Sequence, residues 1–358
     1  MSAASIRLIV VLASVASVAS VASVASVASA ADQDIRFREK VDVERVVIDA
    51  RAVDGHGRPI LGLLARDFQV KVDGKAVPLE SATWVTGTPP DELVPAVEGG
   101  AAAAATGGDV VVGGLPRGRL IVMFFQKDFD PSRVSGLLRM QSKAVKFLET
   151  LGPEDRVAVL TFDYHLKLWQ DFTRDRERLR RVIKQSLFFG KFPSGQSVDP
   201  PSLAANFDFD AAKRAAEPET ALLVTARALQ PLRGPKSLVF FGWGMGRLSG
   251  SSVYLDSDYG PARQALLDAR TTVFTLDVTD ADYHTLEVGL EQVAADTGGF
   301  YAKTHLFPTL AMARLEGALA GHYLLVFEKP GYKRGAHRVE VKLQGMKGDV
   351  LAKSYYVD

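Results

Sequence analysis

The feature that most constrains this chain is an all-apolar run at residues 120–125, which is followed at once by oxygen-bearing side chains. The run leads into Gln126 and then into Asp128, Asp130 and Ser132, just before a helical pattern begins. A strand without polar residues is typical of a sheet that is covered on both faces. Open α/β sheets bind ligands outside the carboxyl ends of their strands. We therefore expect binding chemistry at this end of the sheet.

After Arg119 the chain alternates between strand-like and helix-like segments. The expected strands are 120–125, 156–162, 167–172, 237–241, 272–277 and 300–303. Apolar residues at helical spacing mark 134–151, 175–187, 219–229, 261–269, 285–296 and 308–320. This rhythm predicts an α/β fold in which a doubly wound, mainly parallel sheet is covered by helices on both faces.

The two ends of the chain, residues 31–85 and 322–358, have a different pattern. In both, short apolar runs are separated by glycine-containing turns, such as the Asp-Gly turns that begin at Asp54 and Asp73. Such alternation is typical of antiparallel strands. We predict that the C-terminal strands pack with the N-terminal β-domain and form an accessory β-sandwich. The α/β domain, at 119–321, would then be inserted between the two halves of that sandwich.

Two further segments carry no core pattern. Residues 1–30 contain one basic residue, an apolar run of Val-Ala-Ser repeats and a small-x-small ending, which predicts a signal peptide. The protein would then be exported, either periplasmic or secreted. The alternative is an uncleaved segment that anchors the chain in a membrane, and we expect no other membrane contact. Residues 86–118, rich in Gly, Ala and Pro, predict a low-complexity linker.

Composition excludes several classes of function. The chain has 358 residues and a net charge of +1, so nothing in its overall charge predicts a nucleic-acid partner. It has no cysteine, which excludes disulfides, thiol nucleophiles and thiolate metal sites. Its six histidines lack metal-binding spacing, and there is no Gly-x-Ser-x-Gly motif or phosphate-binding loop. We therefore predict that the protein is not an enzyme.

Four stretches carry a likeness to a known family. They are 70–75, 147–162, 171–175 and 323–327, and the most specific part is the run Gly-Pro-Glu-Asp-Arg-Val-Ala-Val that begins at Gly152. With these stretches the chain resembles the von Willebrand factor type A domain, in particular the von Willebrand-A-related proteins of acidobacteria. The resemblance covers nearly the whole chain after the signal segment. It implies a bacterial protein that binds other proteins.

The resemblance also implies where a metal would be expected. Domains of this family hold Mg²⁺ through an Asp-x-Ser-x-Ser run after the first strand, a Thr in a later loop and an Asp after the fourth strand. A carboxylate from the partner completes the shell. The first element corresponds here either to Asp128, Asp130 and Ser132 or to a run starting at Gln126, whose neutral amide is a poorer Mg²⁺ ligand than a carboxylate.

The remaining metal ligands are not matched well. Gly242-Trp243-Gly244 replaces the acid after the fourth strand, and the Thr has only Thr173, Ser194 or Ser197 as candidates. We therefore predict a degenerate metal site and no cofactor. The alternative is a rearranged Mg²⁺ site at Asp128, Asp130 and Ser132, which would make the protein a divalent-cation-dependent adhesion protein.

A second cluster follows a later strand, between Asp277 and His284. It places three carboxylates and an imidazole on one strand-to-helix connection. One interpretation is a helix N-terminus at which acids satisfy free backbone N–H groups. The other is a displaced cation or partner site that uses Asp280, Asp282 and His284. The phenylalanine-rich segment 188–209 is likewise open to two interpretations, an interaction surface or a lid over the helices.

Taken together, these patterns predict an exported, non-enzymatic protein-binding or scaffolding protein. The predicted binding residues are Asp128, Asp130, Ser132, Trp243, Asp280, Asp282 and His284. A purely structural role in the cell envelope stays open. An envelope hydrolase that uses Asp128, Asp130 or His284 is a further alternative, although no nucleophile–base pair can be located.

Overall fold

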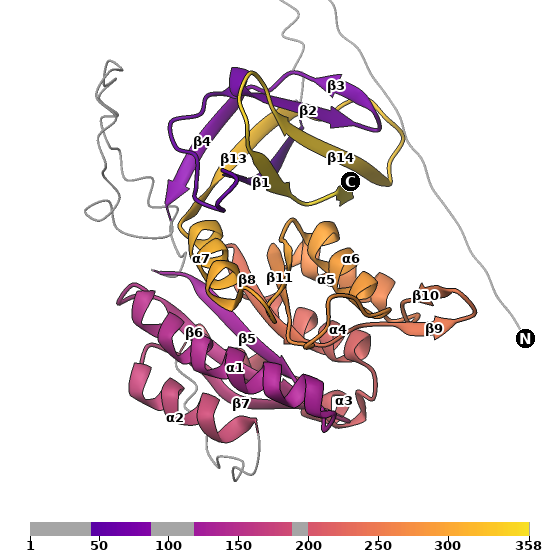
Figure 1. Cartoon of the computed structure of the whole chain (residues 1–358). Coiled ribbons are helices and arrows are strands. Elements are labelled where there is room, and N and C mark those ends of the chain that lie inside the picture. The colour runs from indigo at the N-terminus through magenta and orange to yellow at the C-terminus, as the bar shows by residue number, and fades with distance from the viewer. Residues whose placement is uncertain (1–43, 87–117, 188–199, 358) are drawn as a thin grey trace, which may run out of the picture. The chain divides into compact units, whose positions relative to one another are not determined.

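A computed structural model describes residues 44–86, 118–187 and 200–357 (Figure 1). The expected signal peptide, most of the expected linker and the first part of the phenylalanine-rich segment lie outside these residues. Among the described residues, no helix is both long and apolar enough to cross a membrane.

The central element is a six-stranded sheet. Its strands are β5 (Leu120–Gln126), β6 (Arg156–Phe162), β7 (Leu166–Thr173), β8 (Lys236–Gly242), β11 (Thr271–Asp277) and β12 (Tyr301–Lys303). They lie in the order β12-β11-β8-β5-β6-β7, and all neighbours are parallel except β6 and β7. This is the order of a doubly wound sheet. From β5 the chain first adds strands on one side of the sheet and then, from β8 onward, on the other side, so the strand order reverses between β5 and β8. The predicted α/β class with a mainly parallel sheet is confirmed.

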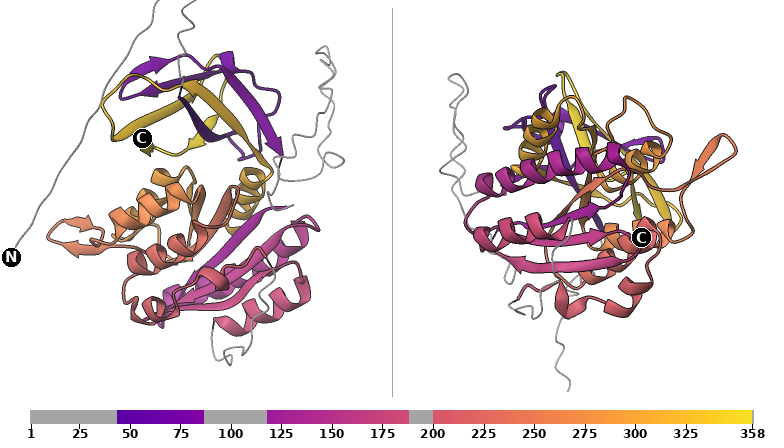
Figure 2. Two further views of the ribbon diagram at one scale, coloured as in Figure 1. Left: turned by 180° about the vertical axis from the view of Figure 1, so that it is seen from behind. Right: turned by 60° about the horizontal axis from the view of Figure 1, so that its bottom comes forward.

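Both faces of this sheet are buried under helices (Figure 2). The apolar side chains on one face pack with α1 (Pro131–Phe147), α2 (Arg176–Ser186) and α7 (Pro308–Leu319). Those on the other face pack with α3 (Phe209–Arg214), α4 (Pro218–Leu229), α5 (Tyr259–Asp268) and α6 (Glu287–Thr297). Because both faces are covered, β5 and β8 can be apolar along their length.

Two stacked phenylalanine pairs join β5 to β8, one on each face. Phe124 and Phe240 stack at 4.8 Å between ring centroids, and Phe125 and Phe241 stack at 4.6 Å. The members of each pair are directly opposite in the parallel register. Successive side chains of a strand point to opposite faces, so the two pairs belong to different cores. The centre of the sheet is thereby held in one register.

Strands from both ends of the chain form two antiparallel sheets of four strands each. One has the order β15-β1-β13-β4 and consists of β1 (Arg45–Val53), β4 (Ser81–Thr86), β13 (Gly321–Glu328) and β15 (Asp349–Ala352). The other has the order β16-β14-β2-β3 and consists of β2 (Phe68–Val72), β3 (Lys75–Val77), β14 (Ala336–Leu343) and β16 (Tyr355–Val357). Their apolar side chains share one core. A separate hairpin, β9 (Arg247–Ser249) and β10 (Ser252–Tyr254), follows β8.

Tyr323 lies at the centre of that shared core. Its hydroxyl donates to the Ile60 carbonyl at 2.9 Å and accepts from the Leu63 N–H at 3.1 Å. Its ring makes edge contacts with Phe68 and Trp84. A single hydroxyl thus fastens the chain between β1 and β2 to strand β13.

We expect Tyr323→Phe to lower the free energy of unfolding by about 1–3 kcal/mol, because it leaves the half-buried Ile60 carbonyl and the buried Leu63 N–H without their partner. Urea denaturation would measure the change as a lower midpoint with an unchanged slope. Tyr332→Phe is the control, since the Tyr332 hydroxyl makes no hydrogen bond to the described residues. Equal midpoints for Tyr323→Phe and the wild type would contradict the expectation.

Candidate functional site

The candidate site lies where β5 and β8 end, at the point where the strand order reverses. Gln126, the last residue of β5, is buried, and its amide bonds to the loop that follows β8. The amide nitrogen donates to the Gly244 carbonyl at 2.9 Å. The amide oxygen accepts from the N–H of Trp243 at 2.9 Å and from that of Gly244 at 3.3 Å. Both heteroatoms of Gln126 are therefore committed to holding this loop.

The glycines of that loop are required by close approaches. A Cβ added at Gly242 would lie 2.1 Å from the Phe240 ring and 2.7 Å from the Gln126 amide oxygen. Gly244 has a φ of +157°, and its Cβ would lie 2.5 Å from Leu286. A side chain at either position would force the loop to move. Gly242 and Gly244 are two of the three residues that stand where the family resemblance would place an acid, and neither has room for a side chain.

Arg133 occupies the centre of the candidate site. Its guanidinium forms an ion pair with Asp128, and its Cζ lies 3.8 Å from the centroid of the Trp243 ring. Asp128 also accepts from its neighbouring backbone, at 2.6 Å from the Phe129 N–H and 3.1 Å from that of Asp130. Burial by itself raises the pKa of Asp128, but Arg133 and these N–H groups outweigh it and lower the pKa. The guanidinium is thus held between a carboxylate and an indole.

Asp130 and Ser132 form the N-terminus of α1. The Asp130 carboxylate accepts from the Ser132 N–H at 2.9 Å and from the Ser132 hydroxyl at 2.5 Å. Asp130 is the N-cap residue, and Pro131 follows it as the first helical residue, which is a favoured start for a helix. The Ser132 carbonyl accepts from the Asp280 N–H at 3.3 Å. The two side chains therefore begin the helix, and the Ser132 backbone carbonyl connects it to the loop after β11.

Asp280 packs that loop against α1. Its carboxylate bonds to Ser135 and forms an ion pair with Arg139. The approach is close because Gly136 has no side chain: a Cβ there would lie 1.6 Å from the Val278 carbonyl. Asp280, like Asp128, therefore has a basic partner within its own chain.

The side chains at this edge, as they are placed, do not fit a Mg²⁺ shell, which needs several oxygen ligands in near-octahedral geometry. The Gln126 oxygen accepts two backbone hydrogen bonds, Asp128 is paired with Arg133 and Asp130 caps α1. Thr173 lies at the other end of the strands, where the parallel strands begin. This is because β7 runs antiparallel and Thr173 pairs with Val157 near the start of β6. Ser194 and Ser197 lie outside the described residues.

A second polar cluster surrounds the buried carboxylate of Asp277 at the end of β11. One of its oxygens lies 2.7 Å from His284 Nε2 and accepts from the Tyr301 hydroxyl at 2.8 Å. Glu287 lies 3.4 Å from the same hydroxyl and forms an ion pair with Lys303 at 2.9 Å. Burial, followed by the charge of Asp277, raises the pKa of Tyr301 strongly, so this hydroxyl stays protonated.

The structure divides the predicted binding residues between these clusters. Asp128 and Trp243 meet through Arg133, and Asp130, Ser132 and Asp280 lie along the start of α1. His284 belongs to the Asp277 cluster, and the Asp282 side chain is exposed, with its carboxylate 3.0 Å from His305. Sequence reasoning missed the partner groups Arg133, Arg139, Tyr301 and Lys303. The only signal for the first two was a pair of arginines on the helix that follows the acids.

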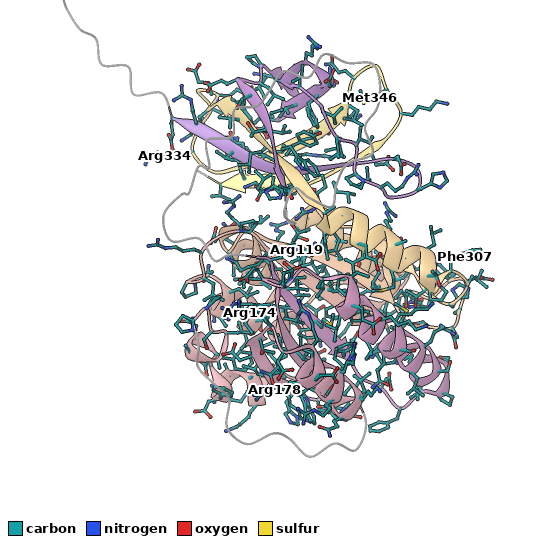
Figure 3. The ribbon with its side chains drawn as sticks, turned by 90° about the vertical axis from the view of Figure 1, so that its left-hand side faces the viewer. Arg119, Arg174, Arg178, Phe307, Arg334 and Met346 are labelled. Atoms are coloured by element: carbon teal, nitrogen blue, oxygen red, sulfur yellow. The ribbon has the colours of Figure 1, made fainter. Side chains whose placement is uncertain are left out.

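Large exposed side chains follow four strands at the end of the sheet where these clusters lie. Phe129 after β5 is 77% exposed, Tyr164 after β6 78%, Tyr283 after β11 67% and Phe307 after β12 65%. All four lie in segments that follow the carboxyl ends of strands parallel to one another, β6 included. Figure 3 shows Phe307 projecting from the chain next to α7. Sequence reasoning did not select any of these rings. We call these four residues the aromatic rim.

No family model and no curated protein matches this chain. Similar solved structures include a conserved hypothetical protein, BatB, from Bacteroides thetaiotaomicron, which is 14% identical over 56% of this chain and 97% of its own, with a TM-score of 0.36. A von Willebrand factor type A protein from Catenulispora acidiphila is 10% identical over 66% of each chain, with a TM-score of 0.41. The PilB minor pilin from Streptococcus sanguinis is 12% identical over 78% of this chain and 88% of its own, with a TM-score of 0.37.

The von Willebrand A resemblance expected from the sequence is thus also found among solved structures. Because each of these TM-scores is below 0.5, the likeness is distant, and we derive a function from the chain's own residues.

We expect Gln126→Ala to lower the free energy of unfolding by about 1–3 kcal/mol and to change the fluorescence of Trp243, because three backbone groups of the β8 loop lose their partner. Denaturation and emission spectra would measure both effects. Gln141→Ala is the matched control. The Gln141 amide also bonds to a backbone carbonyl, that of Ile183 at 2.9 Å, but within the described residues it makes no hydrogen bond to the loop that carries Trp243. An emission change that persists in a Trp243→Phe background would contradict the assignment to this loop.

Proposed function

We propose that this chain is an exported, non-enzymatic protein that binds another protein through the carboxyl edge of its α/β sheet, without a metal ion. The observation that carries the proposal is the aromatic rim. Large aromatic side chains are enriched at the centres of protein interfaces, and scattered single apolar residues are normal whereas a gathering of them is not. The four rings follow the carboxyl ends of β12, β11, β5 and β6, of which β11 and β5 are separated by β8, and Arg133 is held at the same end of the sheet. Such an arrangement is suited to an interface.

The electrostatics support binding without a cation. Two acids of the candidate site, Asp128 after β5 and Asp280 after β11, each form an ion pair with an arginine of α1. A divalent ion would have to displace these guanidinium groups from the carboxylates, and the nearby Gln126 oxygen already accepts two backbone hydrogen bonds. We infer that Arg133, stacked on Trp243, is the polar centre of the contact surface.

The remaining parts of the proposal rest on the sequence and on the hydrogen bonds of the described residues. The signal-like residues 1–30 support export. Within the part of the chain that the structure describes, no hydroxyl nucleophile bonds to His284, which supports a non-enzymatic role. The two antiparallel sheets would form a β-sandwich that carries the binding module.

A second candidate function is cation-dependent binding at a rearranged site. It is favoured by one observation: the ligand atoms of Asp277, His284 and Glu287 all lie within 4.8 Å of one another. Imidazole and carboxylate groups suit Zn²⁺ and related ions. Against it, Lys303 and Tyr301 already occupy the hydrogen-bonding positions of the two carboxylates.

We expect the double variant Phe129→Ser, Phe307→Ser to bind its partner at least about 100-fold more weakly, since truncating central aromatic anchors costs most of the binding energy of an interface. The partner would first be recovered from the envelope fraction of the source organism and then purified and titrated. Met346→Ser, which changes an exposed apolar residue in the β14–β15 turn, is the matched control and should bind normally (Figure 3). Unchanged affinity of the double variant, or loss of binding in EDTA, would overturn the proposal.

We expect calorimetric titration of residues 31–358 with Mg²⁺, Mn²⁺, Ca²⁺ and Zn²⁺ to show no saturable binding, because the acids of the site already have partners. Two variants separate the alternatives. Binding that is lost in Asp128→Ala, Asp130→Ala would establish a cation-dependent adhesion site at the start of α1. Binding that survives there and is lost in His284→Ala would establish the second candidate.

A further inference from the structure

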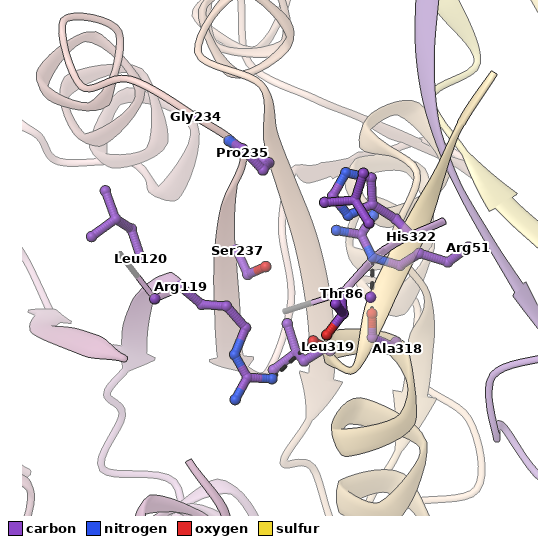
Figure 4. Close-up of a pocket in the computed structure, with 13 residues that line it drawn as sticks. Arg51, Thr86, Arg119, Leu120, Gly234, Pro235, Ser237, Ala318, Leu319 and His322 are labelled. Atoms are coloured by element: carbon purple, nitrogen blue, oxygen red, sulfur yellow. Dashed lines mark hydrogen bonds between the residues drawn. The ribbon is translucent and has the colours of Figure 1, made fainter. Parts of the chain in front are cut away.

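A cavity of about 200 Å³ lies at the opposite edge of the sheet from the candidate site, where β5 and β8 begin (Figure 4). Its walls come from the first residues of these strands, from the end of α7 and from β1, β4 and β13. The lining includes Arg51, Arg119 and His322 but no acidic side chain. Among these side chains Arg51 is the unusual one, because buried charges are normally paired with a carboxylate.

Arg51 is the buried cation of this cavity. It is 6% exposed, and its two bonded nitrogens have neutral acceptors: Nε donates to the Ala318 carbonyl at 2.9 Å and Nη1 to the Thr272 hydroxyl at 3.1 Å. Within the described residues its third nitrogen, Nη2, makes no hydrogen bond. Burial lowers the pKa of Arg51 to about 10, although the charge of Asp49 acts in the opposite direction. The guanidinium therefore has a free donor and no hydrogen-bonded carboxylate.

Arg119 differs from Arg51, because its charge is already matched. It contacts both carboxylate oxygens of Asp155, each 3.0 Å from its Nε, and its Nη1 donates to the Leu319 carbonyl at 2.8 Å. Arg119 therefore forms part of the wall and is not a free donor. Arg51 is therefore the arginine of the wall that has no hydrogen-bonded carboxylate.

Ser237 supplies a second free donor. The residue is buried, and within the described part of the chain its hydroxyl makes no hydrogen bond. His322, also buried, has its Nε2 3.4 Å from Asp49. Figure 4 shows the His322 ring beside Arg51 and the Ser237 side chain at the cavity. The other walls include Leu120, Pro235 and Leu319, which are apolar.

We propose that this cavity binds a short-chain monocarboxylate. Its carboxylate would accept from Arg51 Nη2 and from the Ser237 hydroxyl, and its hydrocarbon part would contact the apolar wall. A monoanion is favoured because the cavity offers one guanidinium without a hydrogen-bonded carboxylate, so a dianion would bury a second charge without a partner. At roughly 30 Å³ for each water-sized group, the cavity holds about six or seven heavy atoms, which sets the size of the acid.

Butyrate is the probe that fits this description. Calorimetry and thermal unfolding of residues 31–358 would compare sodium butyrate with sodium chloride and sodium phosphate at equal ionic strength. We expect saturable binding of butyrate and, at about 100 times its Kd, a rise in Tm of about 5 °C. Ser237→Ala should weaken binding about tenfold while leaving both hydrogen bonds of Arg51 intact.

A second variant tests the site from the opposite direction. Ser237→Asp places a carboxylate where the ligand would lie, so it should raise Tm and abolish the response to butyrate. Ser186→Asp is the matched control: it puts an acid at another buried serine, whose hydroxyl bonds to the Ile183 carbonyl, and it should lower Tm. The proposal is overturned if butyrate acts no differently from chloride, if phosphate binds as tightly as butyrate, or if Ser237→Asp still binds butyrate.

Discussion

The arrangement of the carboxyl edge depends on the hydrogen bonds between the Gln126 amide and the loop after β8. This one side chain satisfies three backbone groups of Trp243 and Gly244 at the point where the sheet reverses its strand order. Fixing that loop places the indole of Trp243 under Arg133, and Arg133 in turn fixes Asp128. In doubly wound sheets this crevice is where a ligand normally enters. Here both heteroatoms of the Gln126 amide are bonded to the loop after β8, so in the proposed function the partner would contact the surrounding loops.

Much of the fold could be predicted from the sequence, because burial on both faces leaves a strong apolar signal in β5 and β8. The direction of β7 could not be predicted, because an edge strand has the same pattern of apolar and polar residues whether it runs parallel or antiparallel. That single unknown made Thr173 a metal-ligand candidate, although it lies at the other edge. The spacing of residues along the sequence does not show at which end of the sheet the last residue of a strand lies.

The position of the candidate residues after strand ends could be predicted from the sequence, but the partner of each side chain could not. Carboxylates after strand ends can be found in a sequence, whereas their partners come from a helix whose rotation is set by packing. Gly136 allows α1 to approach the Val278 carbonyl closely, and this packing accompanies the pairing of Arg139 with Asp280. His284 was grouped with Asp280 and Asp282, yet it bonds to Asp277, because that side chain is buried at the end of β11. Tertiary packing, rather than neighbouring positions, selects the partner of each charge.

The two edges of the sheet differ in how their charges are matched, and this difference bears on what each edge can bind. At the carboxyl edge Arg133 is held by Asp128 and Trp243 before any partner arrives, so little of its side-chain freedom remains to be lost on binding. Phe129 and Phe307 have only two side-chain torsions each, so they too are ordered at low entropic cost. A metal-bridged contact would derive its strength from an ion that must be supplied. In the proposed function a preorganised arginine stacked on Trp243 needs none, and the affinity would depend on this preorganisation and on the fit of the partner rather than on the concentration of a divalent cation.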